Sequence, residues 1–145
     1  MKHLLIILFA ISFIGCNNVT SNDEASAIEE VEATLRAASD FSTDKVTYKA
    51  GDIVVLQLEN KSNENIGYNL CSAQLEQQKV TNWEIVPSDR MCTAVVYTLE
   101  PGKSTTYEIK LDDNMAAGEF RFIAEIHLLE SKVKGRRLSN TFKVN

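Results

Sequence analysis

Apolar and polar residues alternate with a period of two through most of the chain after Thr43. The longest alternating set is Phe120, Phe122, Ala124, Ile126 and Leu128. Such alternation is typical of strands with one buried and one solvated face. Turn residues interrupt the runs at intervals of roughly 8–12 residues, as at Glu100-Pro101-Gly102. The pattern therefore predicts a succession of short strands joined by tight turns.

The number of these strands predicts the architecture. Further runs lie at Val54–Glu59, Ile66–Leu70, Trp83–Val86, Cys92–Leu99, Tyr107–Leu111 and Phe142–Val144. One-sided alternation in many strands requires two sheets that share one apolar interior. We expect an all-β sandwich of seven to eight antiparallel strands in two sheets.

Several turn-and-strand motifs resemble those of a known family. They are Tyr48-Lys49-Ala50-Gly51-Asp52 before Val54, Trp83, Leu99-Glu100-Pro101-Gly102-Lys103-Ser104, and Gly118-Glu119-Phe120-Arg121-Phe122. Together they look like the bacterial immunoglobulin-like domains of small lipoproteins, over residues 43–145. The resemblance implies an immunoglobulin-like β-sandwich, but it specifies function poorly, because this fold carries many unrelated roles.

The start of the chain has the features of an export signal. Lys2 supplies a positive charge, and Leu4–Ile14 is apolar except for Ser12. This run is well short of the roughly 20 residues that cross a membrane as a helix. A basic start, a short apolar run and a small residue before the cut predict a signal peptide over residues 1–15.

The expected cut site, Phe13-Ile14-Gly15-Cys16, resembles the lipobox of lipoprotein signal peptidase substrates. The resemblance implies that the Cys16 thiol carries lipid, although Phe13 departs from the usual aliphatic residue. Loose versions of this kind are similar to those of Bacteroidota lipoproteins. We expect a lipid-anchored protein of the bacterial envelope, in the outer membrane, with its periplasmic or surface face undetermined. An ordinary secreted protein is the alternative.

Residues 16–30 are predicted to form an acidic tether, and residues 31–145 the domain. An acidic stretch after the lipidated cysteine resembles a surface-export signal, and a plain spacer is the alternative. Residues 28–39 fit two patterns: Ile28, Val31 and Leu35 suit a helix, whereas alternation of Val31 and Leu35 with their neighbours suits a strand. We favour a first strand, because the downstream chain has β character.

The net charge of the chain argues against nucleic acid as a partner. Removal of residues 1–15 takes away one lysine and no acid, leaving 14 basic and 20 acidic residues, a net charge of −6. Nucleic-acid binding depends on clustered lysine and arginine at phosphates. We expect no nucleic-acid partner.

Cys71 and Cys92 are predicted to form a structural disulfide. They lie in an exported domain and form an even set once Cys16 carries lipid. A redox pair or metal thiolates would be the functional alternative, but no Cys-x-x-Cys spacing is present to lower a thiol pKa.

No residue pattern indicates catalysis, a metal or a cofactor. His127 is the one histidine after the cut, and alternation places it on the outward face beside Glu125. A blue-copper site would need two histidines. Asp112-Asp113-Asn114 is more typical of a solvated turn than of a calcium loop. We expect a protein that is not an enzyme.

Lys132, Lys134, Arg136 and Arg137 surround Gly135 at an expected hairpin tip. They form either a solvated turn or a contact loop for an acidic partner, a lipid headgroup or a polysaccharide. The sequence thus predicts a membrane-anchored, non-catalytic module that binds another envelope protein or glycan. Alternatives are a protease-inhibitor-like module, since Gly51–Asn60 also resembles bacterial intracellular proteinase inhibitors, and a structural spacer.

Overall fold

The computed structural model of the protein describes residues 21–145. The predicted signal peptide and the predicted lipid site, Cys16, lie outside these residues. The described chain runs through α1 (Ser21–Ala38), β1 (Ser39–Thr43), β2 (Thr47–Tyr48), β3 (Ile53–Asn60), β4 (Ile66–Tyr68), the 3-10 turn η1 (Leu70–Ser72), β5 (Gln74–Gln78), β6 (Trp83–Ile85), β7 (Tyr97–Leu99), β8 (Ser104–Lys110), β9 (Gly118–Leu128), β10 (Lys134–Leu138) and β11 (Phe142–Val144).

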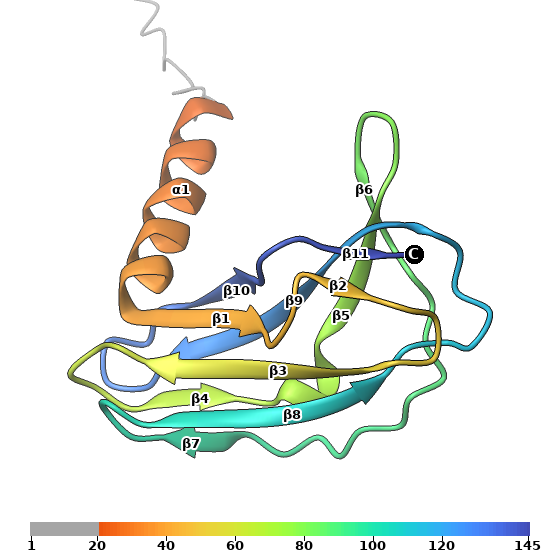
Figure 1. The fold of residues 1–145 in the computed structure, drawn as a ribbon. Coiled ribbons are helices and arrows are strands. Elements are labelled where there is room, and N and C mark those ends of the chain that lie inside the picture. Colours follow the sequence, from red (N-terminus) through yellow and green to blue (C-terminus); the bar gives the residue numbers. More distant parts are fainter. Residues whose placement is uncertain (1–20) are drawn as a thin grey trace, which may run out of the picture.

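The strands form two sheets, which confirms the predicted sandwich (Figure 1). The smaller sheet has the order β1-β3-β8 and is antiparallel. In the larger sheet the long strand β9 pairs with β4, β5, β10 and β11. The described chain has eleven strands, more than the seven to eight expected, and β2 pairs with β11 in parallel. The additional strands are short or polar, as in Gln74–Gln78, so alternation did not reveal them.

The alternating apolar residues form the core, as the pattern predicted. Val54, Leu56 and Leu58 are fully buried, and the β9 side chains of Phe120, Phe122 and Ile126 face them from the other sheet. Each such side chain stabilises the fold by about 1.5–3 kcal/mol relative to exposure. Phe142 of β11 stacks on the rings of Phe120 and Phe122, with centroids 6.0 and 5.8 Å apart. The two sheets therefore share one interior, centred on aromatic rings from β9 and β11.

The expected first strand over residues 28–39 is wrong, because residues 28–38 lie in helix α1 and only Ser39 belongs to β1. The helix is rich in alanine and glutamate and free of glycine and proline, a composition that favours helix. Val31, Leu35 and Ala38 lie on its packed side, whereas Ala33 and Ala37, which a strand would place beside them, are exposed. The predicted tether is thus helical from Ser21 onward.

Helix α1 docks on the sandwich through its last two turns. It packs against β10, and its residues 26–30 are all exposed, so the helix projects from the strands (Figure 1). The Ser39 hydroxyl donates to the Leu35 carbonyl at 2.8 Å where the helix ends and β1 begins. Among residues 21–145, no helix is long and apolar enough to span a membrane.

The expected strand over Cys92–Leu99 is wrong in its first part, because only Tyr97–Leu99 is a strand. The Asn69 side-chain amide donates to the carbonyls of Thr93 and Val95, at 2.8 and 2.9 Å. Those carbonyls are therefore used by a side chain instead of a neighbouring strand. Residues 86–96, hereafter the strap, have no regular secondary structure.

Candidate functional site

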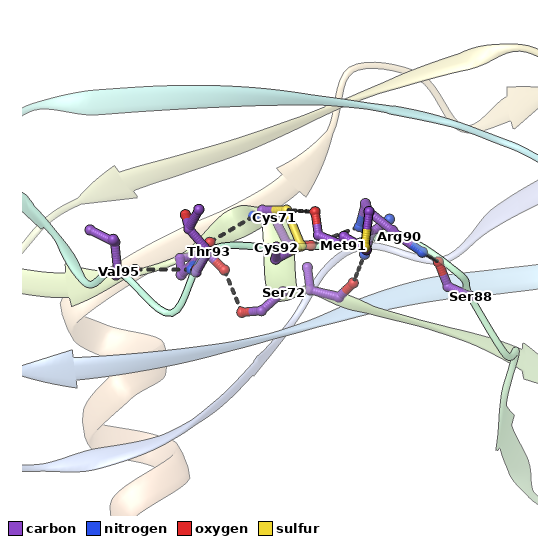
Figure 2. The surroundings of a disulfide bond; sticks show 10 residues. Cys71, Ser72, Ser88, Arg90, Met91, Cys92, Thr93 and Val95 are labelled. Carbon is purple, nitrogen blue, oxygen red and sulfur yellow. Dashed lines mark hydrogen bonds between the residues drawn. A yellow bond between two sulfur atoms is a disulfide. The ribbon is translucent and has the colours of Figure 1, made fainter.

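The strap is joined covalently to the sandwich. Cys71 in η1 and Cys92 in the strap form a disulfide with Cα atoms 5.7 Å apart, which confirms the predicted pair (Figure 2). The bridge lies between the end of β4 and the strap that leads to β7, and both strands belong to the larger sheet. It therefore fixes a connecting segment within one sheet and does not join the two sheets.

Polar side chains hold the strap on both sides of the disulfide. Arg90 donates through Nε to the Cys71 carbonyl at 2.7 Å and through its terminal nitrogen to the Ala73 carbonyl. Burial lowers the pKa of Arg90. Beyond the disulfide, Asn69 supplies the two bonds described above. Figure 2 shows Arg90 on one side of the disulfide and Thr93 and Val95 on the other. The strap is thus held in place along most of its length although it is not part of a sheet.

The strap and the first residue of β7 present apolar side chains to solvent. Met91 is 96% exposed, Val96 59% and Tyr97 48%, and the run from Met91 to Leu99 contains no charged residue. Exposed apolar groups on a rigid segment are common where proteins recognise partners. This run is an uncharged segment with exposed apolar side chains beside the disulfide.

A groove of about 710 Å³ lies beside the strap. Its lining includes the buried side chains of Ile109 in β8, Phe122 in β9 and Leu111, which directly follows β8. Arg90 also lines the groove, as does the exposed ion pair in which Lys110 Nζ lies 2.9 Å from Asp113. Pockets that bind ligands combine an apolar surface with a few polar groups in this way. The groove and the adjoining strap form the candidate binding site.

The four predicted contact-loop residues do not lie together at a hairpin tip. The turn before β10 contains Lys132, which has a φ of +61°, whereas Lys134, Arg136 and Arg137 belong to β10 itself. Gly135 does not supply the bend, because it pairs with Ile126 in the middle of the β9–β10 ladder. A glycine was misinterpreted as a turn signal here.

The basic side chains of β10 have different partners. Lys134 forms an ion pair with Glu125 of β9. Arg137 donates to the hydroxyl of Ser39 at 3.2 Å and to its carbonyl at 3.0 Å. Arg136 and Arg137 line a small pocket together with Arg36 of α1, a residue that the sequence reasoning missed. The sequence gives little reason to group Arg36 with these residues, because it is distant from the basic run.

His127 lies where alternation placed it, on the outward face of β9. Its side chain is 31% exposed, and its Nε2 atom lies 3.1 Å from Glu125. Within residues 21–145, no three histidine, cysteine, aspartate or glutamate side chains are grouped as metal ligands would be.

The model of the bacterial Ig-like domain family matches residues 35–143. The chain belongs to this family. The match begins inside α1, so most of the exposed part of the helix precedes it. The Ig-like fold supports a non-catalytic binding or structural module.

Comparison with solved structures finds a likeness to the ASH / PapD-like domain of human CEP192 (PapD-like domain 7). The two are 12% identical, with a TM-score of 0.44, over 96% of this chain and 96% of that chain. No curated protein matches the chain.

Proposed function

We propose that this Ig-like protein is a lipid-anchored, non-catalytic module of the bacterial envelope that binds another envelope protein or glycan. The main support for the lipid anchor is the pairing of the cysteines. The chain has three, and Cys71 and Cys92 are joined to each other. Cys16 remains, directly after Gly15 and an apolar run, as the thiol for lipid.

The shape of α1 supports a spacer role. A helix rises 1.5 Å per residue, so the 18 residues of α1 span about 27 Å. Its last turns are packed on β10, and residues 26–30 extend from the sandwich (Figure 1). In this proposal the helix connects the anchored cysteine to the domain and holds the domain away from the membrane surface.

The strap and its groove support the binding role. The disulfide and the bonds from Arg90 and Asn69 hold the strap in position before any ligand arrives. Preorganisation of this kind lowers the entropy cost of association. Met91 and Val96 of the strap and Tyr97 of β7 are exposed and provide apolar contacts outside the lining of the groove.

Site-specific photocross-linking in intact cells tests the binding role. A cross-linking residue at Met91, which is 96% exposed, should give a defined adduct with an envelope protein or glycan. The matched control is Val46, an apolar residue that is 67% exposed in the β1–β2 connection, outside the strap. The Met91 adduct should be lost in the Cys71→Ala/Cys92→Ala variant. Equal adducts at both positions, or none at Met91, would contradict the proposed binding surface.

A further inference from the structure

The smaller sheet ends at a strand whose outer edge is open. Within residues 21–145, β8 pairs with β3 on one side and with no strand on the other. The Leu111 amide, directly after β8, donates to the Asp52 carbonyl, so the odd-numbered residues of β8 bond toward β3. The main-chain groups of Thr106, Glu108 and Lys110 therefore point away from β3. All three residues are exposed, and no main-chain group of the described chain bonds to them.

The larger sheet extends past this open edge. The Tyr68 hydroxyl of β4 donates to Thr105 Oγ1 of β8 at 3.2 Å, so β4 lies opposite β8. β7 is the next strand outward, below β8 in Figure 1, and no strand of the described chain lies opposite it. Tyr97 of β7 pairs with Tyr68 and shares its inner face, with ring centroids 5.8 Å apart, yet it is 48% exposed. The smaller sheet thus lacks a strand that would cover Tyr97.

The groove continues the uncovered space along β8. It is lined by Ile109 and Lys110 at the end of β8 and by Arg90 and Cys92 of the strap. Tyr97 lies toward the start of β8, so an extended segment along the whole open edge would cover its ring and enter the groove. Charged side chains on an edge strand limit indiscriminate pairing. That role explains neither the uncovered ring nor the groove on the same side.

We propose that an extended polypeptide segment of the partner binds here as an added strand of the smaller sheet. Unpaired main-chain groups at alternate residues match another strand, which gains affinity from main-chain hydrogen bonds and selectivity from alternate side chains. Apolar residues of the segment would face Tyr97 and the groove, and charged residues would lie beside Glu108 and Lys110.

The layer beneath the open edge favours a single peptide strand over a second copy of the chain. A second copy would bring its own β4 and β7 beneath its β8, into the space that β7 and the strap already occupy. A peptide strand brings no second layer. The inference rests on the proposed binding function and makes the partner a polypeptide instead of a glycan.

Titration of the full chain in a neutral detergent with a synthetic peptide tests the inference. The probe, Val-Glu-Val-Lys-Val-Thr-Val, can pair antiparallel with its lysine opposite Glu108 and its glutamate opposite Lys110. N-methyl groups on its valines block its far edge and prevent self-association. The probe should bind saturably and slow amide exchange at Thr106, Glu108 and Lys110 at least tenfold. The same peptide with N-methyl groups on its polar residues should not bind, because these groups block the edge that faces β8.

Two substitutions at one position separate main-chain pairing from side-chain contact. Thr106→Pro should weaken probe binding at least tenfold, because proline has no N–H to donate at the open edge. Edge strands tolerate proline where the N–H faces solvent, so pairing with β3 should survive, and urea unfolding checks this. Thr106→Ala is the matched control, because it keeps the N–H and should bind within twofold of the wild type.

A charge exchange tests the register without changing the main chain. Glu108→Lys should weaken probe binding, because like charges then lie opposite each other. A probe with glutamate in place of its lysine should restore binding to this variant. Failure of the exchanged probe to restore binding would contradict the proposed antiparallel register.

No probe binding, equal binding by Thr106→Pro and Thr106→Ala, or unchanged amide exchange along β8 would overturn the inference. A wild-type dimer that Thr106→Pro dissociates would overturn it in favour of a second copy. A Met91 adduct that contains glycan alone, or that persists in Thr106→Pro, would overturn strand addition and leave the proposed function standing. Probe binding without any Met91 adduct would do the reverse.

Discussion

At the scale of single residues, Gly135 permits the contact between α1 and the sheet. A Cβ atom built at this position would lie 2.7 Å from Leu35 Cδ1 and 3.1 Å from Val31 Cγ1. Leu35 is fully buried, so it has little room to move. The glycine allows the helix to approach β10 closely and bury Leu35.

Gly135→Ala should therefore destabilise the protein by about 1–3 kcal/mol, the usual cost of overpacking. Gly118→Ala is the control, because its added Cβ would meet mainly the movable amide end of Gln77, at 2.9 Å. Urea unfolding of both variants measures the difference. Equal stabilities of the two variants would show that the helix does not need this close approach.

Tyr48 links the β1–β2 connection to the core through a buried hydroxyl. The hydroxyl donates to Asp44 at 2.8 Å and accepts from the Lys45 amide at 2.9 Å. Burial, followed by the bond to Asp44, raises the pKa of Tyr48 from 10.0 to about 12. Burial alone would raise the pKa of Asp44, but bonds from the Val55 amide and Tyr48 outweigh it and hold that pKa below 3.8.

Because the pKa of Tyr48 is raised by folding, its contribution to stability is complete below pH 10 and falls as the pH approaches about 12. Tyr48→Phe should lose about 1 kcal/mol at neutral pH and show a shallower decline across this alkaline range. Unfolding free energies measured from pH 7 to 12 test this. Tyr97→Phe, at a ring that is 48% exposed, should follow the wild-type profile. Parallel wild-type and Tyr48→Phe profiles would contradict the assignment.

At the scale of elements, the strap depends on its disulfide. The bridge closes a loop with a sequence separation of 21 residues. Cys71→Ala/Cys92→Ala should lower the unfolding free energy by about 3 kcal/mol in the loop-entropy account. Amide exchange should accelerate at Val86, which bonds to the Leu75 carbonyl, and stay unchanged in the centre of β3. Unchanged exchange at Val86 would mean that Arg90 and Asn69 hold the strap without the disulfide.

Sequence patterns predicted the elements whose burial is one-sided and regular. In β9 the alternating apolar set is buried as expected, and Gly102, with a φ of +70°, forms the predicted turn. Helix α1 was missed because Val31 and Leu35 fit both periods, and its other face carries small alanines that give little contrast. The strand predicted from Cys92 to Leu99 is wrong in its first part, because β-branched residues there favour a strand. In the structure the Asn69 side chain instead donates hydrogen bonds to the carbonyls of Thr93 and Val95.

Contacts between distant segments explain why the candidate site was only partly predictable. The disulfide could be inferred because cysteine pairing follows from export and number. The proximity of Arg36 to Arg137 could not, because the two are distant in sequence and come together only when α1 packs on β10. The basic run itself gave no sign that Lys134 pairs with Glu125 while Arg137 bonds to Ser39 at the end of α1.

At the scale of the whole molecule, the described structure divides into a projecting helix and an Ig-like sandwich with a fixed strap (Figure 1). The proposed account assigns them separate roles: the helix as the connection to an anchored cysteine, and the sandwich as the carrier of binding surfaces. These roles depend on lipid at Cys16, since a protein without an anchor would not need a spacer.

Metabolic labelling with palmitate tests this central claim most directly. The wild-type protein and the Cys71→Ala/Cys92→Ala variant should both incorporate label, because neither change affects the proposed acceptor thiol. Cys16→Ser should incorporate none. Absence of label from the wild type, or equal label in Cys16→Ser, would contradict the account of a lipid-anchored binding module.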